Sequence, residues 1–375
     1  MNARERMLEL AGDVAERCKK CQLCKKECAF LQENGMPGEM AEGLLAGTLD
    51  PAVALACSVC GLCAGVCPVR GLSPQALFQA MREVAVEAEP ARAKRFRPLL
   101  NYETVGLSRP FTFFGVPEGT TRVLFPGCNL PGTRPDIVWN CFLKLREEDP
   151  GLGFVLSCCA KPSLMCGLRP RHEERVAGVL GRLARAGVRE VLTLCPNCHV
   201  TLRRASAEAD SGLVVRTVYE VLAATVREPE GGVAERVRTG VHDPCVLRAE
   251  RPVHEAVRTL LWNTGSSVAE MRHSMHKALC CGEGGGVGFS RPDLAAAWRA
   301  RRAEEATERR VVTYCAGCAV SLAGTVDPVH LLDLVLGLEP APASTWTRGL
   351  RTYLNRLGLK RRVRAYLRAG GSAGS

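Results

Sequence analysis

Cysteine is the residue type in this chain with the greatest capacity for chemistry. Twenty cysteines occur among 375 residues, and most of them recur at short, regular spacings. No cleavable signal peptide is expected ahead of them, because charged residues recur with helical spacing in residues 1–17. We therefore expect a cytoplasmic protein, in which thiols do not persist as structural disulfides and regular spacing favours metal ligation or redox chemistry.

Two runs near the N-terminus share the spacing C-x2-C-x2-C-x3-C. Their members are Cys18, Cys21, Cys24 and Cys28 in the first run and Cys57, Cys60, Cys63 and Cys67 in the second. Both runs resemble those of bacterial two-cluster ferredoxins, in which the fourth cysteine of a run binds the neighbouring cluster. The resemblance implies two [4Fe-4S] clusters with crossed ligand sets, Cys18, Cys21, Cys24 and Cys67 for one and Cys57, Cys60, Cys63 and Cys28 for the other.

Zinc is the alternative metal for these runs, because two C-x2-C units also bind zinc with four thiolates. The third cysteine of each run is superfluous for such a site, and this favours iron–sulfur clusters. Ala29 stands where the ferredoxin pattern has a proline after Cys28, but this departure removes no ligand.

Ten further cysteines form two sets of five that repeat along the chain. The first set is Cys128, Cys158, Cys159, Cys195 and Cys198, and the second is Cys245, Cys280, Cys281, Cys315 and Cys318. Corresponding members lie 117 to 122 residues apart, and five coincidences at nearly one offset predict duplicated domains. Because ligand sites of open α/β sheets gather at the carboxyl ends of strands, each set is expected to converge.

Short apolar runs alternate with helical stretches through this repeat, which is typical of an α/β layer. The fold class expected is therefore α/β, with a helical N-terminal domain ahead of two duplicated α/β domains. The expected divisions are a helical two-cluster domain in 1–97, a linker in 98–121, the first α/β domain in 122–232, the second in 233–340 and a basic amphipathic tail in 341–375.

Each five-cysteine set, with its vicinal pair and later C-x2-C, resembles the cysteine-rich CCG domain of the heterodisulfide reductase family. The repeat behind a two-cluster domain is similar to the D-type subunit of that family, and to the iron–sulfur subunits of glycolate oxidase and anaerobic glycerol-3-phosphate dehydrogenase. The resemblance implies one or two additional noncubane [4Fe-4S] clusters, one for each complete set. It also implies that a disulfide is cleaved between the two sites, with Cys158, Cys159, Cys280 and Cys281 as the catalytic thiols.

Different residues come after the two vicinal pairs. Cys280 and Cys281 precede Gly282 and a glycine run that permits close backbone approach and amide donation. Cys158 and Cys159 instead precede Ala160, Lys161 and Pro162. The first site is therefore expected to differ from the second in cluster type, potential or occupancy.

Several other residues suggest chemistry without requiring it. His242 and Asp243 beside Cys245, and His199 after Cys198, could donate protons or hydrogen-bond to the ligands, but structural roles are favoured. Cys141 and Cys166 fall outside both sets and are expected to be ordinary buried thiols. No flavin or nicotinamide motif can be placed in the glycine run, so electrons must come from a flavoprotein or another electron-donating partner.

Most of the net charge of +11 resides in the tail. Eight basic residues occur there without an acidic one: Arg348, Arg351, Arg356, Lys360, Arg361, Arg362, Arg364 and Arg368. The rest of the chain is therefore nearly balanced, and no nucleic-acid partner is expected. The tail is read either as an interfacial segment giving peripheral contact with the inner face of the membrane, or as a helix packed on its own domain. An acidic partner subunit would also satisfy its charge.

The primary functional hypothesis is an iron–sulfur oxidoreductase subunit. Two [4Fe-4S] clusters would pass single electrons to the CCG sites for disulfide and thiol chemistry, as the family resemblance implies. The alternative is an electron-relay and membrane-anchoring subunit of a flavoprotein dehydrogenase, of the glycolate, lactate or glycerol-3-phosphate type, that delivers electrons to quinone. The third hypothesis is a zinc-rich scaffold protein.

Overall fold

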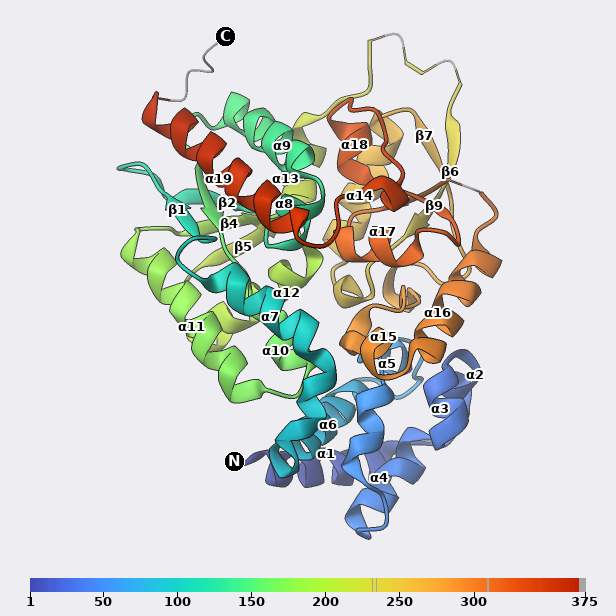
Figure 1. The fold of residues 1–375 in the computed structure, drawn as a ribbon. Coiled ribbons are helices and arrows are strands. Elements are labelled where there is room, and N and C mark those ends of the chain that lie inside the picture. The colour runs from blue at the N-terminus through green and yellow to red at the C-terminus, as the bar shows by residue number, and fades with distance from the viewer. Residues whose placement is uncertain (231, 234, 309, 371–375) are drawn as a thin grey trace.

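The computed structural model describes residues 1–370 except 231, 234 and 309. Its N-terminal part is helical, at the lower end of the molecule in Figure 1, and its described residues form no strand before Phe113. The helices are α1 (Ala3–Arg17), α2 (Leu23–Glu27), α3 (Ala29–Asn34), α4 (Pro37–Leu45), α5 (Leu62–Gly65), α6 (Pro74–Ala88) and α7 (Arg97–Leu107), with 3-10 turns η1 (Pro51–Ala56) and η2 (Pro90–Phe96). Helix α1 packs against both α4 and α6.

Local sequence explains why α1 begins and packs where it does. The Glu5 backbone N–H donates to Asn2 Oδ1 at 2.8 Å, and the Asn2 N–H donates to Glu5 Oε2 at 2.9 Å. This reciprocal capping satisfies amide groups that the first turn leaves without partners. Met7, Ala11 and Val14 recur on one face and are buried, so the same helix offers an apolar stripe to its neighbours.

A five-stranded sheet comes next in the chain, with strand order β1-β3-β2-β4-β5. Its strands are β1 (Phe113–Gly115), β2 (Arg122–Phe125), β3 (Gly153–Leu156), β4 (Glu190–Thr193) and β5 (Val214–Thr217). All neighbours are parallel except β1, which pairs antiparallel with β3 at the edge. The connecting helices are α8 (Asn129–Thr133), α9 (Pro135–Glu148), α10 (Lys161–Met165), α11 (Arg169–Arg185), α12 (Pro196–Glu208) and α13 (Val218–Thr225).

A second sheet of four parallel strands has the order β7-β6-β8-β9. Its strands are β6 (Val237–His242), β7 (Ser266–Ala269), β8 (Arg310–Thr313) and β9 (Asp327–His330). The helical segments are η3 (Cys245–Leu247), α14 (Arg251–Asn263), η4 (Met275–Lys277), η5 (Gly284–Gly286), α15 (Val287–Ser290), α16 (Pro292–Glu305), α17 (Ala316–Leu322), α18 (Leu331–Val335) and η6 (Ala343–Thr345). This order repeats that of β3-β2-β4-β5, so the protein combines a helical part with two α/β parts.

Two segments differ from their simplest sequence interpretation. Residues 98–121, expected to be a linker, contain most of α7 and strand β1. In the tail, α19 (Arg351–Arg368) packs against α8, α9 and β1 with Leu359 and Val363 buried. The structure therefore has the packed helix rather than a free amphipathic segment. No helix within the described residues is long and apolar enough to cross a membrane.

Arg82 of α6 joins the helical part to both α/β parts. Its side chain is fully buried and donates hydrogen bonds to carbonyl oxygens on three separate segments. The acceptors are Ala54 at 2.8 Å, Leu55 at 3.1 Å and Cys57 at 2.5 Å near η1, Met165 in α10, and Gly285 in η5 at 2.8 Å. A guanidinium has five N–H donors in a rigid plane, which allows one side chain to hold these carbonyls together.

Replacing Arg82 by Met should lower the free energy of unfolding by roughly 3 kcal/mol or more, because buried carbonyls on three segments lose their donors together. Thermal unfolding of the anaerobically purified protein measures the effect. Arg95 is exposed, and Arg95→Met makes the same chemical change at a surface position, where less than about 0.5 kcal/mol is expected. Equal transition temperatures for the two variants would contradict this role of Arg82.

Candidate metal centres

The two N-terminal cysteine runs fold into matching loops. The second run repeats the first at a constant offset of 39 residues. Lys20 and Gln22 have positive φ angles of 47° and 64°, and Val59 and Gly61, at the same positions in the second run, have 49° and 75°. Left-handed backbone costs about 1 kcal/mol or more for a side chain with Cβ. Both loops therefore curl tightly in a way that turns their thiols toward a common centre.

The thiols group across the two runs rather than within them. Burial, together with the nearby Cys18, Cys21 and Cys67, raises the pKa of Cys24 to about 11. Burial and then the proximity of Cys57 and Cys60 raise the pKa of Cys28 well above its usual value. These proximities agree with the crossed ligand sets that the ferredoxin resemblance implies, and the sets themselves stay a prediction. A donor set of four thiols, with a backbone N–H of Val59 donating to Cys57 Sγ at 3.3 Å, suits a [4Fe-4S] cluster.

The five-cysteine sets lie at the carboxyl ends of the two sheets. Within each set, neighbouring thiols form a series. The series begins at the first cysteine, continues through the vicinal pair and ends at the C-x2-C pair. The order of neighbouring thiols is Cys128, Cys158, Cys159, Cys198 and Cys195 in one set and Cys245, Cys280, Cys281, Cys318 and Cys315 in the other. Residues far apart in sequence thus converge as the parallel strands require.

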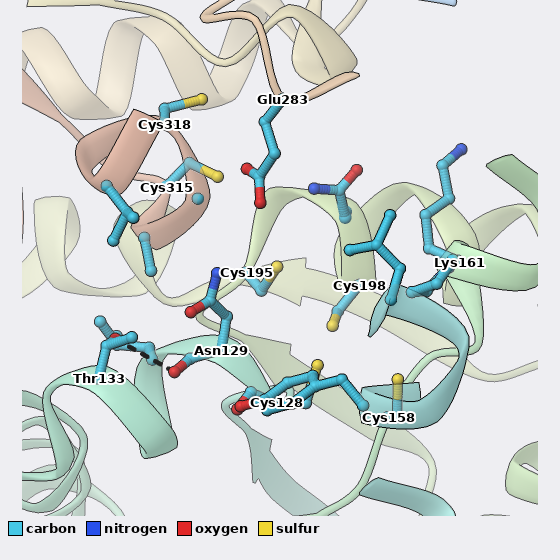
Figure 2. A pocket seen from close by; sticks show the side chains of 18 of the residues that line it. Cys128, Asn129, Thr133, Cys158, Lys161, Cys195, Cys198, Glu283, Cys315 and Cys318 are labelled. Atoms are coloured by element: carbon cyan, nitrogen blue, oxygen red, sulfur yellow. Dashed lines mark hydrogen bonds between the residues drawn. The ribbon is translucent and has the colours of Figure 1, made fainter. Parts of the chain in front are cut away.

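One cavity of about 560 Å³ lies between the two sets. Figure 2 shows thiols of both sets around it, with Cys195 and Cys198 on one side and Cys315 and Cys318 on the other. The cavity-lining cysteines are Cys128, Cys158, Cys159, Cys195, Cys198, Cys245, Cys281, Cys315 and Cys318. A small molecule in this cavity would therefore meet both sets at once.

Cys280, the remaining member, contacts the N-terminal part instead. Cys60 of the second N-terminal run packs against the buried cluster that contains Cys280. The proximity of Cys280, together with burial, raises the pKa of Cys60 well above its usual value. The glycine run permits the approach. A Cβ at Gly284 would lie 2.6 Å from the Ser58 carbonyl oxygen, and one at Gly285 would lie 2.5 Å from that of Cys57. The missing side chains thus bring two cysteine sites together.

The residue that follows the vicinal cysteine pair is glycine in the second set and alanine in the first. Gly282 has a φ of 90°, and a Cβ there would lie 2.5 Å from the Ala295 carbonyl oxygen. Ala160, at the corresponding position of the first set, keeps a left-handed φ of 57° and is fully buried. His172 Nδ1 lies 2.9 Å from the Ala160 carbonyl oxygen. The first site therefore holds a strained alanine where the second requires glycine.

Two charged residues on the cavity escaped the sequence reasoning. Glu283 and Lys161 occupy corresponding positions, immediately after Gly282 and Ala160, and both line the cavity. The Glu283 carboxylate extends toward Cys315 in Figure 2, where a Cβ at Gly317 would collide with it. Glu283 is exposed along the cavity, and partial desolvation there together with the nearby Cys281 raises its pKa to about 8. Their place beside each vicinal pair is the sequence signal that could have identified them.

The candidate acid–base residues divide into two groups. His242 is buried and lies within 4.8 Å of Cys281 and Cys318, so it contacts the second set directly. His199 instead faces Glu250, with Nε2 and Oε2 3.8 Å apart.

Asp243 has a structural role, because its carboxylate is bound by several neighbouring side chains. Burial alone would raise its pKa, but hydrogen bonds with His254 and Arg258 and the charge of Arg258 hold it well below its usual range. Tyr314 also donates to Asp243 Oδ1 at 2.8 Å.

The two cysteines outside the sets, Cys141 and Cys166, are fully buried, and burial raises the pKa of each to about 12.

Two family models match this chain. A 4Fe-4S dicluster domain matches residues 14–71, and a cysteine-rich domain named CCG matches residues 239–323. The first match contains both N-terminal runs, and the second contains the whole second five-cysteine set. These matches indicate that the chain binds iron–sulfur clusters.

Three curated relatives are similar to this chain over 70% to 74% of its length. Over 296 residues the chain is 27% identical to the B-type subunit of fumarate reductase (CoM/CoB) of Methanothermobacter marburgensis, covering 74% of this chain and 58% of that protein. Over 290 residues it is 25% identical to the D-type subunit of dihydromethanophenazine:CoB–CoM heterodisulfide reductase of Methanosarcina barkeri, covering 70% and 69%. An uncharacterized iron–sulfur protein of Methanocaldococcus jannaschii is 26% identical over 284 residues, covering 70% and 55%.

The chain spans little more than half the length of two of these three relatives. Two of the relatives are named as subunits of redox enzymes. The cysteine sites, the two domain matches and these relatives lead to one conclusion. The chain contains a 4Fe-4S dicluster domain and a CCG domain, and it is similar to the D-type subunit of heterodisulfide reductase.

Proposed function

We propose that this chain carries single electrons inward from its N-terminal cysteine runs to the five-cysteine sets, where a disulfide is reduced to two thiols. The observation that carries the proposal is the contact between Cys60 and Cys280. It connects the second N-terminal site directly to the second five-cysteine set. Iron–sulfur clusters bound at these sites would supply one-electron redox chemistry.

The sites form a continuous series through the protein. Cys18, Cys21, Cys24 and Cys67 would hold the outer [4Fe-4S] cluster, and Cys57, Cys60, Cys63 and Cys28 the inner one. The proximity of Cys24 to Cys63 connects these two groups. Beyond the contact between Cys60 and Cys280, the two five-cysteine sets face each other across the cavity. No step in this series requires an electron to cross a long stretch of protein without a thiol site.

The cavity suits a disulfide because nine thiols of the two sets surround it. Reduction breaks one sulfur–sulfur bond, consumes two electrons and two protons, and gives two thiols. Two sites facing the same bond can each receive one of the two sulfurs, and Cys158, Cys159, Cys280 and Cys281 are the catalytic thiols of this proposal. His242 and Glu283 are placed beside the second set, within reach of a proton transfer.

The two α/β parts share one strand order and one order of thiol contacts, and we infer that they are duplicated domains. Their boundaries are proposed at 122–232 and 233–340, behind the helical domain of residues 1–97. Ala160 and Lys161 make the first site unlike the second. This difference favours a second candidate function, in which the chain only relays electrons between a flavoprotein or other donor subunit and another partner.

A direct test measures reduction of a disulfide by the anaerobically purified chain with its partner subunits. Low-temperature electron paramagnetic resonance with and without thiol should show a thiol-dependent signal. Clusters that take up electrons while no disulfide is reduced would favour the relay. A preparation without iron or acid-labile sulfide would overturn both functions.

Replacing Cys280 by Ala should remove about four iron atoms per chain, since one four-iron site loses a ligand. It should also abolish disulfide reduction, while the N-terminal clusters still take up electrons. Iron analysis and cluster reduction by a small photoreductant measure the two effects. Cys141→Ala is the matched control, because Cys141 is also a fully buried cysteine but belongs to no site. Full iron content in Cys280→Ala would contradict the ligand assignment.

A methyl group added at Gly282 should damage the second site, because its Cβ would lie 2.5 Å from the Ala295 carbonyl oxygen. Gly282→Ala is expected to lose the iron of that site and about 2 kcal/mol of stability or more. Gly324→Ala is the control, since Gly324 has nearly the same φ, 92°, but open space around it. Both variants carry the same backbone strain, so equal iron losses would show that crowding at Gly282 is unimportant.

A further inference from the structure

A group of lysines surrounds the first N-terminal run. Residues 18–26 contain four lysines and no acidic residue. Lys19, Lys20 and Lys26 are exposed, and Lys25 is half-buried. Within the described residues only Lys20 has an acidic partner, Glu42, whose Oε1 lies 2.7 Å from Lys20 Nζ. The other three lysines, Lys19, Lys25 and Lys26, therefore keep their positive charge without an ion pair to an acid among the described residues.

Cys21 lies at the centre of these lysines. It is exposed, whereas the other nineteen cysteines, all within the described part of the chain, are buried or half-buried. The left-handed backbone at Lys20 and Gln22 surrounds it in the tight loop described above. Leu23 beside it leaves 48% of its side chain exposed. A shallow groove runs here, lined by Cys21, Gln22, Leu23, Lys25, Lys26 and Gln32.

The acidic residue that ends α2 is already paired with arginine side chains. Glu27, at the end of α2, is buried and pairs with Arg301 and with Arg272, whose nitrogen lies 2.6 Å from Glu27 Oε1. Arg272 nevertheless keeps 63% of its side chain exposed. One carboxylate thus faces two guanidinium groups, and these three side chains together carry a net positive charge.

We propose that Lys19, Cys21, Leu23, Lys25 and Lys26, here called the entry patch, dock a small acidic protein that carries single electrons. The inference builds on the proposed function, because Cys21 belongs to the outer cluster site. In the docked pair the reduced carrier loses one electron, the outer site gains one, and no bond or proton moves. Complementary charge accelerates such encounters, and Leu23 supplies an apolar contact that water leaves on docking.

The patch fits a transient protein partner better than an anionic membrane. Helix α2 has five residues, and Leu23 is its exposed large apolar side chain. Membrane-binding helices instead present a continuous apolar face that enters the lipid boundary. Weak, fast-exchanging redox encounters need only a small contact area around an accessible redox site. We therefore expect the patch to bind an acidic protein and not anionic vesicles.

The experiment uses the full-length protein with its clusters and an acidic [2Fe-2S] ferredoxin as probe. Charge reversal in the triple variant Lys19→Glu, Lys25→Glu, Lys26→Glu should slow electron transfer from reduced ferredoxin by about tenfold or more at low salt. It should also flatten the dependence of the rate on ionic strength. Binding of oxidised ferredoxin, measured by surface plasmon resonance, should weaken in parallel.

The control variant makes the same charge change elsewhere. Arg351, Arg361 and Arg368 are exposed residues of α19, and reversing all three to Glu should change the transfer rate by less than about twofold. Equal losses in both variants would overturn the entry patch, since net charge alone would then explain the effect. Unchanged ferredoxin binding in the lysine variant, or lysine-dependent binding to phosphatidylglycerol vesicles without ferredoxin binding, would overturn it as well.

A small photoreductant separates this inference from the proposed function. It should reduce the clusters equally in all three proteins, because it needs no docking surface. Equal photoreduction with slow transfer from ferredoxin supports the entry patch even if no disulfide is ever reduced. Ferredoxin that binds the lysine variant as tightly as the parent protein overturns the patch even if disulfide reduction is intact.

Discussion

The arrangement of the cysteine sites depends on one buried guanidinium. Arg82 donates to carbonyls beside Cys57, in α10 and in the glycine run, and these three segments belong to the helical part and to both α/β parts. No carboxylate neutralises it among these contacts, and burial lowers its pKa. A charge buried in this way is tolerated only because carbonyl dipoles converge on it. The requirement to satisfy Arg82 therefore fixes how the three parts meet.

The position of the cavity between the two five-cysteine sets results from the geometry of the parallel sheets. Parallel strands bring their carboxyl ends to one edge, so the cysteines that come after β2, β3 and β4 gather although they are far apart in sequence. The second sheet repeats the strand order and turns its own cysteine edge to the same space. Lys161 and Glu283 line this cavity from the two α/β parts (Figure 2). The two sides of the cavity therefore differ in these side chains, although their thiols are arranged alike.

Sequence reasoning succeeded where the information is local. The α/β alternation and the helical N-terminal part are evident from apolar periodicity, and the two N-terminal cysteine runs from their short spacings. Contacts between distant residues could not be predicted. Arg82 lies in an amphipathic helix, where an arginine is ordinarily exposed, and Cys60 meets Cys280 only because Gly284 and Gly285 admit another backbone. Strand β1 was missed because three residues give too short a pattern to distinguish from a loop.

Cys21 is exposed while the other cysteines are shielded to different degrees. Dissolved oxygen or peroxide therefore reaches this thiol before the others, and oxidation of cysteine depends on accessibility as well as thiolate character. Damage would begin at the outermost site and leave the buried sulfurs around the cavity intact. Handling in air would therefore change the first N-terminal run before the thiols that line the cavity.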